Sequence, residues 1–93
     1  MMGIPTFQLG TLTATPAALA ALLRSGQAPQ FFLVRHARGD WGDVDAEDWK
    51  LNDAAVREGS RILSAYTTLN GERVWVITEA DRSATTILLP EEY

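Results

Sequence analysis

Alternating apolar and polar residues predict where this chain forms strands. Four segments fit the pattern: residues 7–13, 61–68, 73–79 and 84–89. Gly10 weakens the first of them, because glycine has no side chain to pack in a sheet. The second and third flank Asn70-Gly71, a pair typical of two-residue hairpin loops, and Asp81-Arg82 marks the centre of the next turn. The last three strands are therefore expected to form an antiparallel meander.

Start and stop signals predict three helices between the first strand and the meander. They cover residues 16–25, 29–38 and 46–58, each followed by a glycine. Thr15 is a good N-cap and Pro16 is favoured at the first helical position. Asp45 and Asp48 resemble a capping box at the third helix. The expected buried stripes are Leu19, Leu22 and Leu23 on the first helix and Phe31, Phe32 and Leu33 on the second.

The order of these elements predicts the fold class α+β. We expect a single domain over residues 1–93, with an N-terminal strand, three helices, and an antiparallel three-strand β-meander packed against the helices. The first strand could pair with an edge of that sheet. Apolar residues make up 46% of the chain and charged residues 22%, which is typical of a globular protein.

A two-residue loop at Asn70-Gly71 fixes which side chains share a face of the sheet, because it places Tyr66 opposite Trp75. The face expected to lie under the helices holds Leu63, Ala65, Thr67, Val74, Val76, Thr78, Thr85, Ile87 and Leu89. The opposite face, the aromatic sheet face, holds Ile62, Ser64, Tyr66, Trp75, Ile77, Thr86 and Leu88. That face is too apolar for plain water. We expect it to bind a protein partner or to form a homodimer, unless the N-terminal segment covers it.

Composition restricts the classes of function. The chain has no cysteine, which excludes disulfides and thiolate metal sites. It has no apolar run of about 20 residues and no signal-peptide pattern, so we expect a cytoplasmic protein with no membrane partner. A net charge of −4 argues against nucleic acid as the main partner.

Acidic residues concentrate in one region. Six fall between residues 40 and 53, against one lysine: Asp40, Asp43, Asp45, Glu47, Asp48 and Asp53. They form either a solvated helix face or a surface that steers a basic partner, and Asp43, Asp45, Glu47 and Asp48 are the candidate partner-binding acids, with Tyr66 and Trp75. The spacing fails the calcium-loop pattern, since Ala54 stands where that pattern needs a glutamate. No cofactor or metal is predicted.

Five residues are candidates for a ligand-binding site: His36, Asp40, Trp41, Asp81 and Arg82. His36 is the one histidine, and a nearby Asp40 could orient it as a base. Trp41 could stack on a ligand or plug the core. Arg82 could bind an anion, but the segment around it also fits a plain structural turn. No catalytic residue is assigned.

Two motifs carry a resemblance to a known family. They are residues 36–43, HARGDWGD, and residues 77–90, ITEADRSATTILLP, supported by Thr15-Pro16, Asn52-Asp53 and residues 64–66. With them the chain resembles a family of small uncharacterised proteins of bacterial plasmids and integrating elements, often labelled "plasmid-related". The resemblance covers nearly the whole chain and implies residence on a mobile element. It implies no activity. Ala28 departs from the family, which more often has a capping residue before the proline.

Two hypotheses for function follow. The first is a non-enzymatic interaction protein of a mobile genetic element, which binds and modulates or inhibits a host protein or defence complex. The second is a small enzyme or ligand-binding domain, and it requires His36, Asp40, Asp81 and Arg82 to converge in one pocket.

Overall fold

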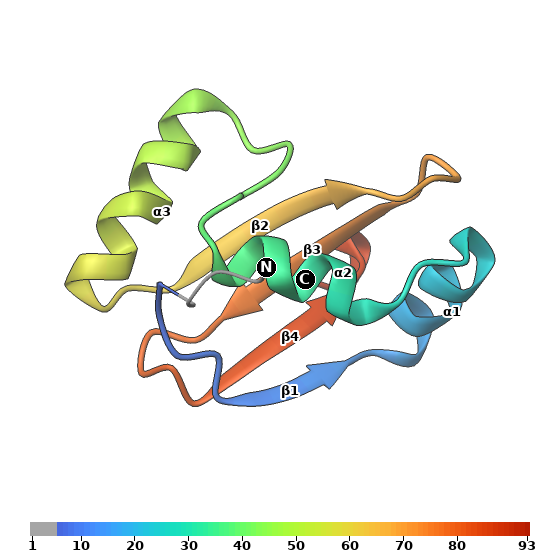
Figure 1. Cartoon of the computed structure of the whole chain (residues 1–93), viewed down its shortest axis with the longest axis horizontal. Coiled ribbons are helices and arrows are strands. Elements are labelled where there is room, and N and C mark those ends of the chain that lie inside the picture. Colours follow the sequence, from blue (N-terminus) through green and yellow to red (C-terminus); the bar gives the residue numbers. More distant parts are fainter. Residues whose placement is uncertain (1–5) are drawn as a thin grey trace.

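The computed structural model describes residues 6–93 as four strands, three α-helices and a final 3₁₀ helix (Figure 1). The first five residues, part of the terminus inspected for a signal peptide, lie outside the described residues. The elements in chain order are β1 (Thr11–Ala14), α1 (Pro16–Ser25), α2 (Pro29–Ala37), α3 (Ala46–Glu58), β2 (Ile62–Thr67), β3 (Arg73–Thr78), β4 (Ala84–Leu88) and η1 (Pro90–Glu92). This confirms the α+β class.

The sheet has the strand order β1-β4-β3-β2. Strands β2, β3 and β4 form the expected antiparallel meander, and β1 adds a parallel pair at the edge of β4. The sheet is therefore mixed, and not simply antiparallel. The first strand also starts later than predicted, at Thr11 and not at Phe7, because the preceding residues cross the end of the sheet and hydrogen-bond to α2 through Thr6 and Ala37.

The helices begin where their local signals predicted, and α1 and α3 also end there, whereas α2 ends at Ala37, one residue before the predicted end. The Thr15 hydroxyl accepts a hydrogen bond from the Ala18 amide at 3.1 Å, and the Asp45 carboxylate accepts from the Asp48 amide at 2.7 Å. Each bond satisfies an amide that the first turn of a helix leaves without a partner. Helix α2 has Ala28 at its N-cap and no side-chain cap.

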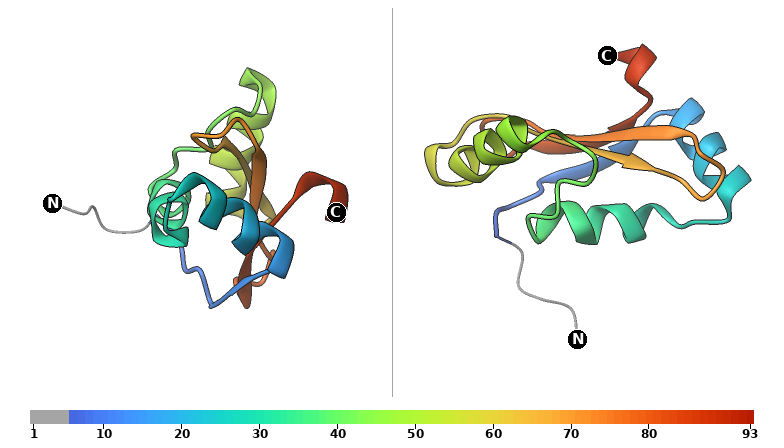
Figure 2. Two further views of the ribbon diagram at one scale, coloured as in Figure 1. Left: turned by 90° about the vertical axis from the view of Figure 1, so that its right-hand side faces the viewer. Right: turned by 90° about the horizontal axis from the view of Figure 1, so that it is seen from above.

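The helices distribute unequally around the sheet. Helix α2 crosses one face, whereas α1 and α3 lie at opposite ends of the molecule (Figures 1 and 2). The main core fills the space between sheet and helices: Ala18, Ala21, Leu22, Phe32, Leu33, Tyr66, Val74, Val76 and Ile87. A second cluster of Trp41, Ala55 and Ile62 lies under α3. The predicted apolar stripes are only partly right, because Leu19, Leu23 and Phe31 are exposed.

The β2–β3 hairpin differs from the prediction by one residue. The Thr68 amide donates to the Glu72 carbonyl at 2.8 Å, and the Gly71 amide donates to the Thr68 carbonyl at 2.9 Å. The loop therefore has three residues, 69–71, with Gly71 in the left-handed conformation at φ 82°. A type I turn followed by such a glycine is the usual three-residue hairpin. Asn70-Gly71 marked the turn correctly but not its length.

The extra loop residue moves every side chain of β2 to the other face. Tyr66 pairs with Val74 and not with Trp75, and it is buried under the helices. Ile62 and Ser64 lie on the same face of β2 and are buried as well. The assignment of Tyr66 to an exposed aromatic sheet face is therefore wrong, whereas the assignments in β3 and β4 are right.

The sheet face opposite α2 is also better covered than expected. The C-terminal segment folds back over this face (Figure 2), and the rings of Trp75 and Tyr93 meet edge to face at 5.6 Å. The Arg61 guanidinium stacks on the Tyr93 ring and donates to its hydroxyl. Ile77 and Leu88 are consequently buried. A C-terminal cover replaces the N-terminal cover considered from the sequence.

Among residues 6–93, no helix has both the length and the apolar composition to span a lipid bilayer.

Candidate functional site

His36 lies at the centre of a buried polar cluster between α2 and the sheet. Its side chain is 0% exposed. Nδ1 lies 2.5 Å from the Ser64 hydroxyl oxygen on β2, and Nε2 lies 2.8 Å from the Thr78 hydroxyl oxygen on β3. Ser64 faces α2 only because of the three-residue hairpin loop. Both ring nitrogens of His36 therefore have partners inside the protein.

The cluster continues through two threonines, and its end fixes the direction of every hydrogen bond. Thr78 and Thr85 hydroxyl oxygens are 2.7 Å apart, and the Thr85 hydroxyl donates to the Leu9 carbonyl at 2.7 Å. A carbonyl only accepts, so Thr85 must accept from Thr78. Thr78 then has no proton left for His36 and accepts from Nε2–H. Because burial keeps the imidazole neutral, Nδ1 of His36 carries no proton and accepts from Ser64.

The surroundings of His36 keep its imidazole neutral. Phe7 and Trp41 pack edge to face against the ring, with centroids at 5.3 and 5.6 Å. Burial, with a smaller effect of the positive charge of Arg82, lowers the pKa of His36 to about 3. A general base needs a free lone pair within reach of a substrate proton. The lone pair on Nδ1 of His36 already accepts a hydrogen bond from Ser64, and the side chain is closed to solvent, so it is not free to act as a base.

Arg82 holds the loop ends together. Its guanidinium donates to four backbone carbonyl groups, those of Ala55, Ser60, Glu79 and Ala80, at 2.7–3.2 Å. The guanidinium carbon also lies 5.6 Å from the centre of the Phe7 ring. Asp81, beside it, accepts from the Ser83 amide at 2.9 Å. The Ser83 hydroxyl, and to a smaller extent this amide, lower the pKa of the exposed Asp81 carboxyl. Both residues have the structural turn role that the sequence left open.

Asp40 pairs with Arg35 and not with His36. The Arg35 Nε donates to the Asp40 carboxylate at 2.7 Å, and the Gly42 amide donates at 3.1 Å. The hydrogen bond from Arg35 is the main reason that the pKa of Asp40 is lowered. The Tyr66 hydroxyl donates to the Asp40 carbonyl at 2.6 Å. Asp40 thus fixes the loop between α2 and α3.

Trp41 is a core residue. It is 1% exposed, and its indole N–H donates to the Asp53 carboxylate at 2.9 Å. The predicted ligand-binding residues are therefore only partly gathered. His36 and Trp41 are in contact, and Phe7 packs against both His36 and the Arg82 guanidinium. Asp40 and Asp81 make separate local contacts. The role of Phe7 was missed, because the sequence placed this residue in the first strand.

The predicted partner-binding acids divide into two groups. Asp43 accepts from the Thr67 hydroxyl at 2.8 Å, and Asp45 caps α3. Glu47 and Asp48 are exposed on the first turn of α3, and Leu51, one turn later, is 63% exposed. Two exposed acids therefore lie one turn before an exposed leucine. Within the described chain, no cluster of histidine and acidic side chains could hold a metal ion.

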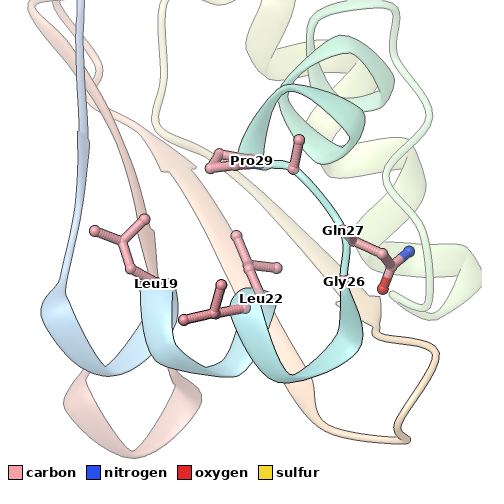
Figure 3. Close-up of a pocket in the computed structure, with 7 residues that line it drawn as sticks. Leu19, Leu22, Gly26, Gln27 and Pro29 are labelled. Carbon is pink, nitrogen blue, oxygen red and sulfur yellow. The ribbon is translucent and has the colours of Figure 1, made fainter.

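The exposed side of α1 was not predicted as a site. A hollow of about 490 Å³ lies between α1 and the start of α2, lined by Leu19, Leu22, Leu23, Gly26, Gln27, Ala28 and Pro29. Figure 3 shows Leu19 and Leu22 on α1 and Pro29 across the hollow. The sequence signal was present, since no charged residue precedes Arg24.

Comparisons of the chain with protein-family models, curated proteins and solved structures found no match. The family resemblance of the two sequence motifs stays a prediction.

Proposed function

We propose that the chain is a non-enzymatic interaction protein of a mobile genetic element, which binds and modulates a host protein or defence complex. One observation supports the non-enzymatic part of this proposal. His36, the candidate base, is fully buried and hydrogen-bonded through both nitrogens. The other candidate reactive groups also have structural partners, so the side chains left for function are those of the surface. The motif resemblance supports the mobile-element part.

The acidic end of α3 is the best surface for such a partner. Leu51 offers an apolar contact, and Glu47 and Asp48 offer charges that steer a basic protein. Helix α3 projects at one end of the molecule (Figure 1), where a partner can reach it without displacing the core. We infer a partner with a basic rim around an apolar pocket. Trp75, half-buried beneath Tyr93, is a less accessible contact.

Affinity capture with matched variants tests this proposal. The tagged chain is compared with L51D, on α3, and with L69D, on the hairpin tip, where the leucine is 80% exposed. Both changes place an acid at an exposed leucine, so both variants should fold, as circular dichroism checks. We expect one stoichiometric partner that L51D loses and L69D retains.

A partner that both variants retain contradicts the α3 surface. If the folded chain captures no protein, and small-molecule screening by thermal shift finds a ligand whose binding the core variant S64A abolishes, the interaction function is wrong.

A further inference from the structure

Asn70 and Gly71 lie together at the exposed tip of the β2–β3 hairpin. Asparagine is a thermolabile residue, because the carbon of its side-chain amide lies within reach of the backbone nitrogen of the next residue. A side chain on that next residue hinders the approach, and glycine has none. The space beside Gly71 is open as well, since nothing lies within 4 Å of a Cβ at this position. The hairpin tip therefore has the sequence and the surroundings that favour attack on the Asn70 side chain.

The chain has one other asparagine, Asn52 on α3, and its environment is the opposite. Asn52 is 6% exposed. Its side chain donates to the Leu63 carbonyl at 2.7 Å and accepts from the Leu63 amide at 3.2 Å. The next residue, Asp53, has a side chain and lies inside the helix, which holds its backbone nitrogen in place. Asn52 is therefore an internal reference that should not react.

Contacts with α1 and the residues after it hold the hairpin tip in place. The Asn70 side-chain amide donates to the Arg24 carbonyl at 2.9 Å. The Arg24 guanidinium donates to the two carboxylate oxygens of Glu72 at 2.9 and 2.7 Å. The Leu69 amide donates to Gln27 Oε1 at 3.0 Å. These contacts, the tip lock, are all exposed to solvent, so they can open locally while the core stays folded.

We propose that Asn70 is a site of spontaneous modification, at which the Gly71 nitrogen attacks the side-chain carbon of Asn70 when the tip lock opens. A bond forms between the Gly71 nitrogen and Asn70 Cγ, and the Cγ–Nδ2 bond breaks. Nδ2 leaves as ammonia and takes the proton of the Gly71 amide. Water then opens the cyclic imide at either of its carbonyl groups, so residue 70 becomes an aspartate or an isoaspartate. The reaction uses only water.

The closed tip restrains this reaction at both reacting groups. The Gly71 amide donates to the Thr68 carbonyl at 2.9 Å, and the Asn70 side chain is held by the Arg24 carbonyl. The nitrogen and the carbon that must meet therefore each have another partner until the tip opens. The rate of modification should follow the fraction of time for which the tip lock is open.

Either product weakens the tip lock. A carboxylate has no hydrogen to donate to the Arg24 carbonyl, and it adds a negative charge at the carbonyl end of α1, where the helix dipole disfavours it. The Arg24 guanidinium is already paired with Glu72. An isoaspartate also adds one carbon to the main chain of a loop whose length fixes the β2–β3 register. This modification is independent of the proposed function, because α1 and α3 lie at opposite ends of the molecule (Figure 1).

Peptide mapping by mass spectrometry tests the proposal on the full chain. Trypsin cuts after lysine and arginine, so Asn70 falls in the peptide 62–73 and Asn52 in the peptide 51–57. After incubation in warm, mildly alkaline buffer, we expect two products of peptide 62–73, each with the mass gain of an amide converted to an acid, and no change in peptide 51–57. A sample digested without incubation corrects for reaction during digestion. No product from the folded chain, a single product, or equal conversion of both asparagines overturns the proposal.

Matched variants separate the attack from its restraint. G71A puts a methyl group beside the attacking nitrogen and should slow the reaction severalfold. E72A removes an exposed ion pair of the tip lock, which costs little stability, and should speed the reaction severalfold toward the rate of the synthetic peptide 62–73. E58A removes an exposed acid of α3 and should react like the parent chain. Equal rates for G71A and the parent refute the attack by the backbone nitrogen, and equal rates for E72A and E58A refute the restraint.

Hydrogen exchange of N70D tests the consequence of the reaction. The amides of Leu69 and Gly71 should exchange faster in N70D than in the parent chain, because the tip lock opens more often. The amides of α3 should exchange at the same rate in both chains. Equal exchange at the hairpin tip would show that the product leaves the tip lock closed.

Discussion

Nδ1 of His36 lies 2.5 Å from the hydroxyl oxygen of Ser64 and accepts a hydrogen bond from that hydroxyl. This contact makes the histidine a structural residue that must stay neutral in the fold. Its pKa is lowered to about 3, against 6.5 in the unfolded chain. Between these values the unfolded state binds a proton that the folded state does not, so the free energy of unfolding rises with pH.

We therefore expect His36 to make the fold acid-sensitive. Its contribution is complete above pH 6.5 and is lost as the pH falls toward 3, at about 1.4 kcal/mol per pH unit. Urea unfolding at pH 5, 6 and 7 measures this slope before the carboxylates titrate. H36Q keeps a donor and an acceptor but does not titrate, so its slope should be nearly flat. If the free energy of unfolding of H36Q depends on pH as strongly as that of the parent chain, His36 is not the source of the acid sensitivity.

Arg82 should be among the most sensitive polar positions. R82A removes a guanidinium that serves four carbonyl groups, and we expect a loss of about 2–4 kcal/mol in thermal or urea unfolding. Arg82 has φ 62°, so R82G, which relieves that backbone cost, should be about 1 kcal/mol more stable than R82A. R57A serves as control, because Arg57 makes one long bond at 3.3 Å. An equal effect of R82A and R57A would refute this role.

Alanine substitutions at two glycines with the same φ angle distinguish the steric cost of an added Cβ from the cost of its left-handed backbone conformation. Gly42 and Gly59 both have φ 75°. A Cβ at Gly42 would overlap the Ala65 carbonyl and the Tyr66 ring, whereas nothing lies within 4 Å of a Cβ at Gly59. We expect G59A to cost about 1–2 kcal/mol and G42A clearly more. Denaturant midpoints of the two variants provide the measurement, and equal midpoints would mean that the loop at Gly42 moves aside.

The cover over Trp75 can be removed at small cost. Tyr93 is 63% exposed, yet its ring contacts Trp75. We expect Y93A to lower stability by less than about 1 kcal/mol but to increase quenching of Trp75 fluorescence by iodide. W75F identifies the contribution of this one tryptophan among three. Unchanged quenching in Y93A would show that Tyr93 does not shield the indole.

The parts of the fold that the sequence predicted are those fixed by neighbours along the chain. Thr15 and Asp45 cap helices through bonds to amides three residues away, and such bonds leave a readable pattern. The hairpin length was not readable, because Asn70-Gly71 suits both a two-residue and a three-residue loop. That one residue decided whether Tyr66 and Ser64 face the helices.

The candidate site was predicted less well for a related reason. The partners of His36 come from 28 and 42 residues away, and only the folded sheet brings them together. Serine and threonine at these positions look like ordinary strand residues until the register is known. The same holds for α1, whose apolar stripe predicted burial but not that one side would remain uncovered.

The parallel pairing of β1 with β4 has a consequence for the order of events during synthesis. Thr11 pairs with Ala84, so β1, which is synthesised before the other strands of the sheet, cannot pair until β4 has been made. Helices and the β2–β3 hairpin can form from local contacts while the chain is still emerging, but this edge requires closure of a long loop. A ribosome carrying the chain would hold an unpaired β1 until β4 has left the exit tunnel.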